Sequence, residues 1–456
     1  MKYLTLEENA KRIKNINDAH KETKAYTVRH RIDDYMPGQA TYSLGDYPEK
    51  FSIEPTEYDY NLLKKLSDSG AQLIQIHEEW NDALRHLGAD KFTSHDEKGL
   101  HNFVDLCHNF DFKVLPYIST GYFNEYDPDF KEDFAKGPYN LRELYYSFRR
   151  CNPGSASWRE YLLPRTFDVV DKYGFDGIYN DWGYDGFHIA WDNGDYDENG
   201  IYDIAYDPEI EDLLCLIYNE VKKRGGIYKL HCGGNNAPNT KDKVYDYLWI
   251  GEAVDAKGVG VGKTYAPYII PCHHMSFSKE GKKTNYFAKT IPFLQFPLLK
   301  IGRPMTGGAY SEAVKCPDIT MYPHPDGGKW FEQEVYEYMQ EHPDGPYVYS
   351  LWSSIPDDVT EFDTWSKYLA LYKPMVTQSS VCYIEVRESE EILSKIPQDV
   401  YASLFVNENM YYVISNLGNE PCEITFKNTW LNRESGEAGK TFTIPGGEMI
   451  FLIKQD

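Results

Sequence analysis

Several hallmarks of common protein classes are missing from this chain of 456 residues. No apolar run reaches about 18 residues, the length that a membrane-spanning helix needs. Lys and Arg number 47 against 71 Asp and Glu, which gives a net charge of −24. This charge argues against nucleic-acid binding, which requires a basic surface, and disfavours contact with anionic membranes. We therefore expect no nucleic acid and no membrane among the partners.

The eight cysteines are scattered and include no CxxC pair. This pattern excludes a disulfide framework and a zinc-finger site, and a chain of this length needs neither for stability. Residues 1–15 are polar and lack the apolar segment of a signal peptide. A cytoplasmic protein fits this, and so does a secreted or periplasmic protein whose signal peptide has been removed. The oligomeric state stays open.

Aromatic residues, in contrast, are abundant, with 39 Tyr, 22 Phe and 9 Trp. Tyr and Trp combine an apolar face with a polar tip, which suits the C–H faces and hydroxyl edges of sugar rings. Packing between a sheet and its helices accounts for most of these residues equally well. The excess of Tyr favours an oligosaccharide or glycoside as the substrate but does not decide the matter.

Residues 1–300 alternate amphipathic helical stretches with short apolar runs. A helical spacing near 3.6 followed by a short strand predicts parallel βαβ units. A doubly wound sheet would show the same alternation. However, polar residues follow nearly every strand, as in the active sites of barrels, and no glycine-rich phosphate loop follows the first strand. We predict a (β/α)8 barrel with strands at 26–32, 71–77, 112–119, 175–181, 227–232, 247–252, 268–276 and 302–307.

The pattern changes near residue 380 to short strands separated by turn residues. Such spacing predicts a small antiparallel β-sandwich. We expect two domains: a catalytic barrel with an N-terminal extension at 1–378, and a C-terminal β-sandwich at 379–456. A role in stabilising the barrel is favoured for the sandwich over sugar binding. The expected strands of the sandwich are 400–406, 410–414, 422–426, 441–444 and 449–453.

Two carboxylates are the candidate catalytic residues. Asp181 directly follows an apolar strand and precedes Trp182 and a loop, so its side chain is expected in the barrel mouth. A helix N-cap is the alternative role for this Asp. Glu252 follows the strand 247–252 in the equivalent place, and a surface ion pair is its alternative. Glu78 and Glu79 are reserve candidates for the second carboxylate that glycoside hydrolysis needs.

Other polar and aromatic residues at the expected strand ends are candidate substrate ligands. Any single His is more often structural than catalytic, but the shared position of the group favours sugar binding. Part of the group (His77, Glu79, Asp181, His231 and Glu252) would also suit a catalytic divalent metal, although no paired-His spacing supports this. The predicted substrate ligands are His77, Glu79, Trp80, Tyr117, Asn180, Trp182, His231, Trp249 and Arg303.

An acidic stretch beyond Asp181 matches the oxygen spacing of an EF-hand-type calcium loop. Side-chain oxygens alternate around Gly200, which provides the sharp turn that such loops need. Tyr206 stands where the loop normally has its final Glu, and Asp207 or Glu209 are possible substitutes. A solvated acidic loop is the alternative. The predicted ligands of a structural Ca²⁺ are Asp195, Asp197, Asn199, Asp203 and the carbonyl of Ile201, and no organic cofactor is expected.

Three segments resemble the α-galactosidase-like glycoside hydrolases, the clan that contains families 27 and 36. These are the Asn-Pro pair at 152–153, the Trp-Arg pair at 158–159 and the run 173–182, within a resemblance over residues 70–310. The resemblance implies Asp181 as nucleophile and Glu252 as acid/base. Two positions depart from the clan: Tyr179 replaces its usual Lys, and Glu252 replaces its usual Asp.

We therefore expect a retaining, exo-acting α-glycosidase. Asp181 would attack the anomeric carbon, and Glu252 would protonate the leaving oxygen and then activate water. Two other functions remain open, a metal-dependent barrel lyase or isomerase acting on sugars and a catalytically inactive carbohydrate-binding barrel.

Overall fold

A computed structural model of the chain describes residues 4–25, 28–44, 52–77, 80–81, 92–94, 96–125, 127–143, 146–184, 207–232, 240–249, 266–272, 283–303, 361–377 and 379–455. The chain divides into two compact units, each built from separated segments. The first comprises residues 1–38, 251–299 and 358–456, and the second comprises 39–250 and 300–357. The sequence predicts a single boundary between two domains, at residues 378 and 379. Within the described ranges, no helix has the length and apolar character needed to cross a bilayer.

Parallel strands form the central sheet of the second unit. Neighbouring strands pair in parallel in the order β3-β4-β5-β9-β10-β11. Strand β13, last along the chain, lies beside β3, the first. This is the strand order of a (β/α)8 barrel, which confirms the predicted fold class. The strands are β3 (Gln39–Ser43), β4 (Leu73–Ile76), β5 (Lys113–Ser119), β9 (Gly177–Tyr184), β10 (Ile227–Cys232), β11 (Tyr247–Trp249) and β13 (Leu299–Gly302).

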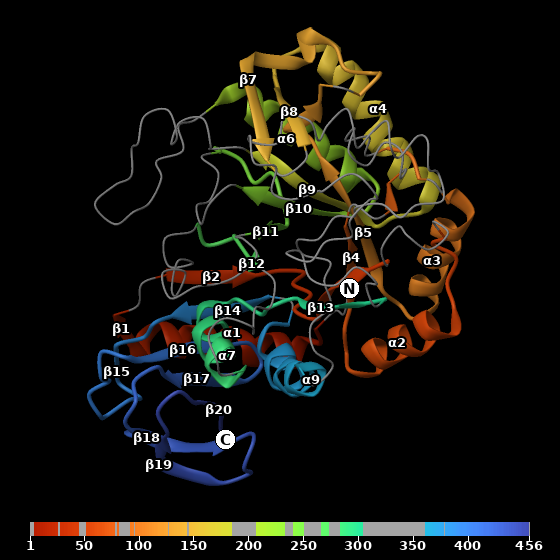
Figure 1. Cartoon of the computed structure of the whole chain (residues 1–456). Helices are drawn as coiled ribbons and strands as arrows, with labels where there is room; N and C mark the ends of the chain where they lie inside the picture. Colours follow the sequence, from red (N-terminus) through yellow and green to blue (C-terminus); the bar gives the residue numbers. More distant parts are fainter. Residues whose placement is uncertain are drawn as a thin grey trace. The chain divides into compact units, whose positions relative to one another are not determined.

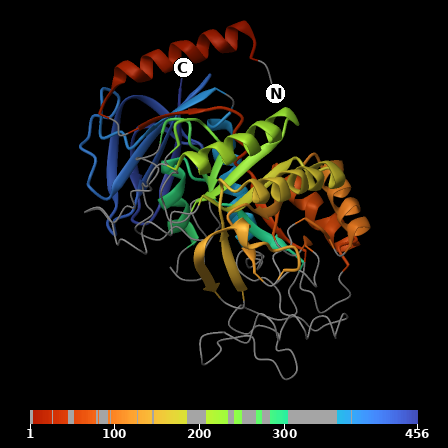
Figure 2. The same ribbon diagram turned by 90° about the horizontal axis from the view of Figure 1, so that it is seen from above.

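Four of the described helices connect these strands, and they cover the outside of the sheet (Figure 1). Figure 2 shows α3, α4 and α6 side by side. Ion pairs join them: Lys172 pairs with Glu97, and Arg159 Nη1 lies 2.6 Å from Asp212 Oδ2. The helices are α2 (Glu57–Asp68), α3 (Glu97–Asn109), α4 (Ala156–Tyr173) and α6 (Pro208–Lys223).

A small antiparallel sheet is inserted between β5 and α4. Its order is β6-β8-β7, and the short helix η3 (Glu132–Phe134) precedes β7. The insertion follows the C-terminal end of β5, the edge at which barrel enzymes carry their functional loops. Its strands are β6 (Tyr122–Asn124), β7 (Ala135–Glu143) and β8 (Tyr146–Cys151).

Local sequence signals explain how the chain enters β9. Ser155 caps α4 by accepting a hydrogen bond from the backbone N–H of Trp158, and Gly174 ends the helix in the left-handed conformation at φ 73°. Both are favoured residues at these positions. Gly177 then begins β9 at φ 142°, where an added Cβ would lie 1.9 Å from the Ile227 carbonyl oxygen. Only glycine allows β9 and β10 to approach this closely.

The prediction for the first barrel strand was wrong. Residues 28–32 form β2 (Val28–Ile32), which pairs antiparallel with β14 (Ser380–Ile384) in the first unit. The first barrel strand is β3, which is fully buried. It was not predicted because the polar residues Gln39, Thr41 and Ser43 interrupt the apolar run that is typical of a buried strand. The last barrel strand, β13, begins before the expected 302–307 and overlaps it at Gly302, and residues 304–307 lie outside the described residues.

The first unit contains an antiparallel sheet in the order β19-β18-β20-β17-β16-β14-β2. The predicted C-terminal strands are all present, although β17, β18, β19 and β20 are longer than expected. Its core includes Trp430, Phe426 and Tyr412, with Ala19 of helix α1 (Leu6–Glu22) packed in the same cluster. The C-terminal strands are β16 (Val400–Val406), β17 (Met410–Asn416), β18 (Cys422–Asn432), β19 (Ala438–Ile444) and β20 (Met449–Lys454).

Shorter elements complete the first unit. They are β1 (Thr23–Ala25) paired with β15 (Glu388–Ser389), β12 (Pro271–Cys272), α7 (Lys283–Thr290), η5 (Ile291–Phe293), α9 (Glu361–Tyr372) and η7 (Lys373–Met375). Within the strand expected at 268–276, residues 271–272 form β12, and 273–276 lie outside the described residues.

Candidate active site

Asp181 lies where the pairing between β9 and β10 is interrupted. Leu230 pairs with Asn180, but the next pair is Cys232 with Tyr184, so β9 has extra residues in this interval. Such bulges redirect side chains and are frequent beside active sites. The strand continues to Tyr184, so the prediction that Asp181 ends its strand was wrong in detail. The carboxylate nevertheless lies in the C-terminal part of the fourth barrel strand.

Both oxygens of the Asp181 carboxylate accept hydrogen bonds. The Tyr117 hydroxyl on β5 donates to Oδ2 at 2.9 Å, and His231 Nδ1 on β10 contacts Oδ1. The Tyr117 hydroxyl also contacts the hydroxyl of Tyr122 on β6. The Asp181 side chain remains 13% exposed. The carboxylate is therefore oriented from both neighbouring strands while keeping some access to solvent.

Two further predicted residues lie with this group. His77, directly after β4, packs its ring edge-on against Tyr179 at 5.7 Å between centroids and lies 6.3 Å from Tyr117. Trp249 on β11 lies 5.3 Å from the Tyr179 ring and 6.2 Å from the ring of His231. The structure thus brings His77, Tyr117, Asp181, His231 and Trp249 together, and we call these five residues the Asp181 group.

The environment keeps His77 uncharged. Burial lowers its pKa to about 3, and the electrostatic interactions with Lys229 and His231 act in the same direction against the opposing effect of Asp181. Near neutral pH, His77 is therefore a neutral imidazole, with one donor and one acceptor nitrogen.

Two predicted ligands lie elsewhere. Trp80 is completely buried and donates from Nε1 to the Tyr117 carbonyl at 3.0 Å. Asn180 is also completely buried and binds Thr120 and the Tyr228 hydroxyl. Successive residues of a strand point to opposite faces, so Asn180 faces away from Asp181. The structure gives both residues protein partners in the core, and we do not propose them as substrate ligands.

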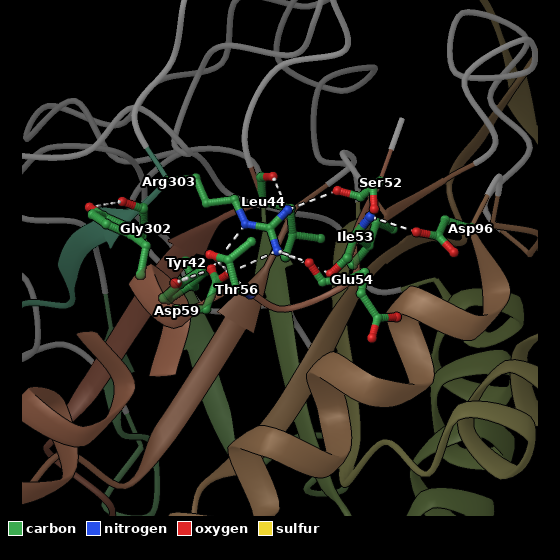
Figure 3. Close-up of polar contacts among 11 residues, drawn as sticks. Tyr42, Leu44, Ser52, Ile53, Glu54, Thr56, Asp59, Asp96, Gly302 and Arg303 are labelled. Atoms are coloured by element: carbon green, nitrogen blue, oxygen red, sulfur yellow. Dashed lines mark hydrogen bonds and ion pairs between the residues drawn. The ribbon is translucent and has the colours of Figure 1, made fainter. Parts of the chain in front are cut away.

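Arg303 was predicted as a substrate ligand but has a dense set of protein partners (Figure 3). Its Nε and Nη2 donate to the Asp59 carboxylate at 2.9 and 3.0 Å. Its Nη1 and Nη2 also donate to the backbone carbonyls of Leu44, Ser52, Ile53 and Glu54. The Tyr42 hydroxyl donates to Asp59 at 2.6 Å. Arg303, which follows β13, is thus tied to β3 and α2, and these contacts support a structural role.

The remaining predicted site residues cannot be placed. Glu79, Glu252 and the reserve candidate Glu78 lie outside the described residues, and only the backbone of Trp182 is described. The predicted calcium ligands Asp195, Asp197, Asn199, Ile201 and Asp203 also lie outside them. Asp207, a possible final ligand, caps helix α6 by accepting from the backbone N–H groups of Glu209 and Ile210.

Three neighbours of the Asp181 group were missed as functional candidates. Gln75, Tyr179 and Lys229 each precede a predicted site residue by two positions, in or directly at the end of the same strand. A period of two places such residues on the same face of a strand. Extending each strand-end prediction backwards by two residues would have found all three.

The geometry suits chemistry at a carboxylate. Asp181 is held by hydrogen bonds, is partly exposed and has buried aromatic side chains as neighbours. Within the part of the chain that the structure describes, no group of three or more His, Cys, Asp and Glu side chains could hold a metal ion.

No protein-family model and no curated protein sequence matches the chain. The chain is, however, similar in fold to solved structures. An α-amylase from Geobacillus thermoleovorans in complex with acarbose has a TM-score of 0.55 at 9% identity, over 93% of this chain and 100% of that chain. Trehalose-6-phosphate hydrolase from Bacillus licheniformis has a TM-score of 0.53 at 13% identity, over 92% and 100%.

A family 36 α-galactosidase from Geobacillus stearothermophilus in complex with 1-deoxygalactonojirimycin is also similar, with a TM-score of 0.53 at 10% identity, over 93% of this chain and 56% of that chain. At such identities the likeness shows the fold alone. It confirms a (β/α)8 barrel accompanied by a β domain, as found in enzymes that are named for acting on glycosidic bonds.

Proposed function

We propose that this protein is a retaining glycoside hydrolase that acts on α-linked sugars, with Asp181 as the nucleophile. The observation that carries the proposal is the placement of Asp181 at the bulge of the fourth barrel strand, with Tyr117 and His231 on its two oxygens. A nucleophile needs a fixed attack geometry, and these two donors supply it. The fold shared with α-amylases and an α-galactosidase supports the same reaction class.

Glu252 is the proposed acid/base. It follows β11, which is separated from β9 by the single strand β10. Retaining enzymes hold their two carboxyl groups about 5–5.5 Å apart, whereas inverting enzymes need about 6.5–9.5 Å. We propose the shorter spacing here, with Glu252 protonating the leaving oxygen and then activating water.

The proposed specificity is that of an exo-acting, α-galactosidase-like enzyme. It rests on the resemblance of residues 152–182 to that clan. Tyr179 stands where the clan has Lys, but its register partner on β10 is Lys229. A lysine is therefore present at the same level of the barrel.

Nitrophenyl α- and β-glycosides provide the first test. We expect release of nitrophenol from α-glycosides, led by the α-galactoside, and no cleavage of internal bonds in starch. A fluorosugar that traps the glycosyl-enzyme should add one glycosyl mass to the wild type at Asp181. Metal-dependent turnover without trapping would indicate the lyase or isomerase instead. Sugar binding without any turnover would indicate an inactive binding barrel.

A further inference from the structure

A lysine lies inside the barrel next to the Asp181 group. Lys229 is completely buried on β10, two residues before His231. Its Nζ donates to Gln39 Oε1 at 2.8 Å and to Gln75 Oε1 at 2.7 Å. An ammonium group has three donors and no acceptor, so any side-chain amide beside it must present its oxygen. Lys229 therefore decides the orientation of the Gln75 amide.

The oriented amide in turn decides the hydrogen-bonding role of His77. With its oxygen on Lys229, Gln75 directs Nε2 toward Nε2 of His77, at 3.1 Å. An amide nitrogen can only donate, so the imidazole Nε2 must accept. Because His77 is neutral at this buried position, its single ring proton is then on Nδ1.

We propose that Lys229 is a positioning residue that acts through Gln75 to hold His77 as the Nδ1–H tautomer. The imidazole contacts the rings of both Tyr117 and Tyr179, and Tyr117 is itself a donor to Asp181. A partner of Nδ1 must consequently be an acceptor, such as a hydroxyl, carbonyl or carboxylate oxygen. If the proposed glycosidase function holds, the relay makes His77 a fixed hydrogen-bond donor in the substrate site.

The tautomer can be measured without any assay of activity. In protein labelled with ¹⁵N-histidine, long-range ¹H–¹⁵N spectra distinguish a protonated ring nitrogen from an unprotonated one. The His77 signals are assigned by their loss in His77→Gln. At mildly alkaline pH we expect a protonated Nδ1 and an unprotonated Nε2.

Gln75→Glu provides the decisive variant. A glutamate of nearly the same shape can still accept from Lys229, but its second oxygen cannot donate to His77. We expect the imidazole proton to move to Nε2, so that the two ¹⁵N signals exchange character. Gln39→Met is the matched control, because it removes the other amide from Lys229 but leaves Gln75 and His77 in contact. It should retain the Nδ1–H pattern.

A wild-type His77 protonated on Nε2, or a Gln75→Glu variant that keeps Nδ1–H, would overturn the proposal. The functional consequence is measured separately as kcat/KM on the best nitrophenyl glycoside. We expect kcat/KM to fall roughly tenfold or more in Gln75→Glu, because Nδ1 of His77 then presents an acceptor instead of a donor to its polar partner. If the protein cleaves no glycoside, the proposed function fails while the spectra still decide the tautomer.

Discussion

Tyr117 and Asp181 lie on adjacent strands, and the Tyr117 hydroxyl donates to Asp181 Oδ2 at 2.9 Å. Tyr117 pairs with Tyr179, so Asp181 is two residues further along β9 on the same face. The long phenol side chain spans this offset and reaches the carboxylate from β5, while His231 contacts it from β10. The first predictions concern this arrangement.

Asp181→Asn should lower kcat by several orders of magnitude while leaving the fold intact, because an amide is a poor nucleophile. The measurement is the rate of nitrophenol release, together with the thermal unfolding midpoint. Asp171→Asn is the matched control, since Asp171 is an exposed carboxylate that pairs with Arg224 on the outer surface. Near-normal activity of Asp181→Asn would place the nucleophile elsewhere.

Tyr117→Phe should reduce kcat about 10- to 100-fold with a smaller effect on KM. The change removes one hydrogen bond to a charged group, worth about 1.5–3 kcal/mol, from the residue that attacks the sugar. Tyr122→Phe serves as a control because it keeps the bond between Tyr117 and Asp181. If both variants lose activity equally, orientation of Asp181 by Tyr117 is not the cause.

Arg303→Met should destabilise the second unit by about 3–5 kcal/mol at neutral pH, because it leaves a buried carboxylate without its cation. Burial alone raises the pKa of Asp59, but its hydrogen bonds and charge interaction with Arg303 outweigh burial and lower the pKa. A carboxyl group whose pKa is lower in the folded state than in the unfolded state stabilises the fold at pH values above its unfolded-state pKa. This contribution is lost as the pH falls through the folded-state pKa.

Denaturant unfolding at neutral and acidic pH checks this prediction. The penalty of Arg303→Met should shrink in acid, where a protonated Asp59 no longer needs a cation. The double variant Asp59→Asn/Arg303→Met should recover part of the stability. A cost within about 0.5 kcal/mol, typical of surface substitutions, would refute the structural role of this pair.

Calcium should raise the melting temperature by binding the folded 195–203 loop. A free calcium concentration of a hundred times Kd should add about 2.7 kcal/mol to the free energy of unfolding. Asp197→Asn should weaken the effect, because it removes a charged ligand from the expected site. Asp192→Asn, in the same acidic stretch but outside the predicted ligand positions, should preserve it. Identical melting curves with calcium and with chelator would exclude the site.

Periodicity allowed much of the barrel to be predicted. Strands β4, β5, β9 and β10 are short apolar runs that follow the amphipathic helices α2, α3, α4 and α6. Such a pattern lies in consecutive residues and can be recognised without knowledge of the fold. Val28–Ile32 has the same local appearance as a barrel strand, yet it pairs with β14, about 350 residues away along the chain. Only long-range pairing separates these two outcomes, and the polar run of β3 could be recognised as a strand only by its burial.

The candidate site divides in the same way. Asp181, His77, His231, Tyr117 and Trp249 could be found from the sequence because parallel strands of a barrel direct their C-terminal ends to the same edge. The sequence alone could not show that Arg303 turns to Asp59, or that Lys229 orients an amide on β4. Those contacts join residues 244 and 154 positions apart, and only the tertiary arrangement of the strands brings their polar atoms within hydrogen-bonding distance.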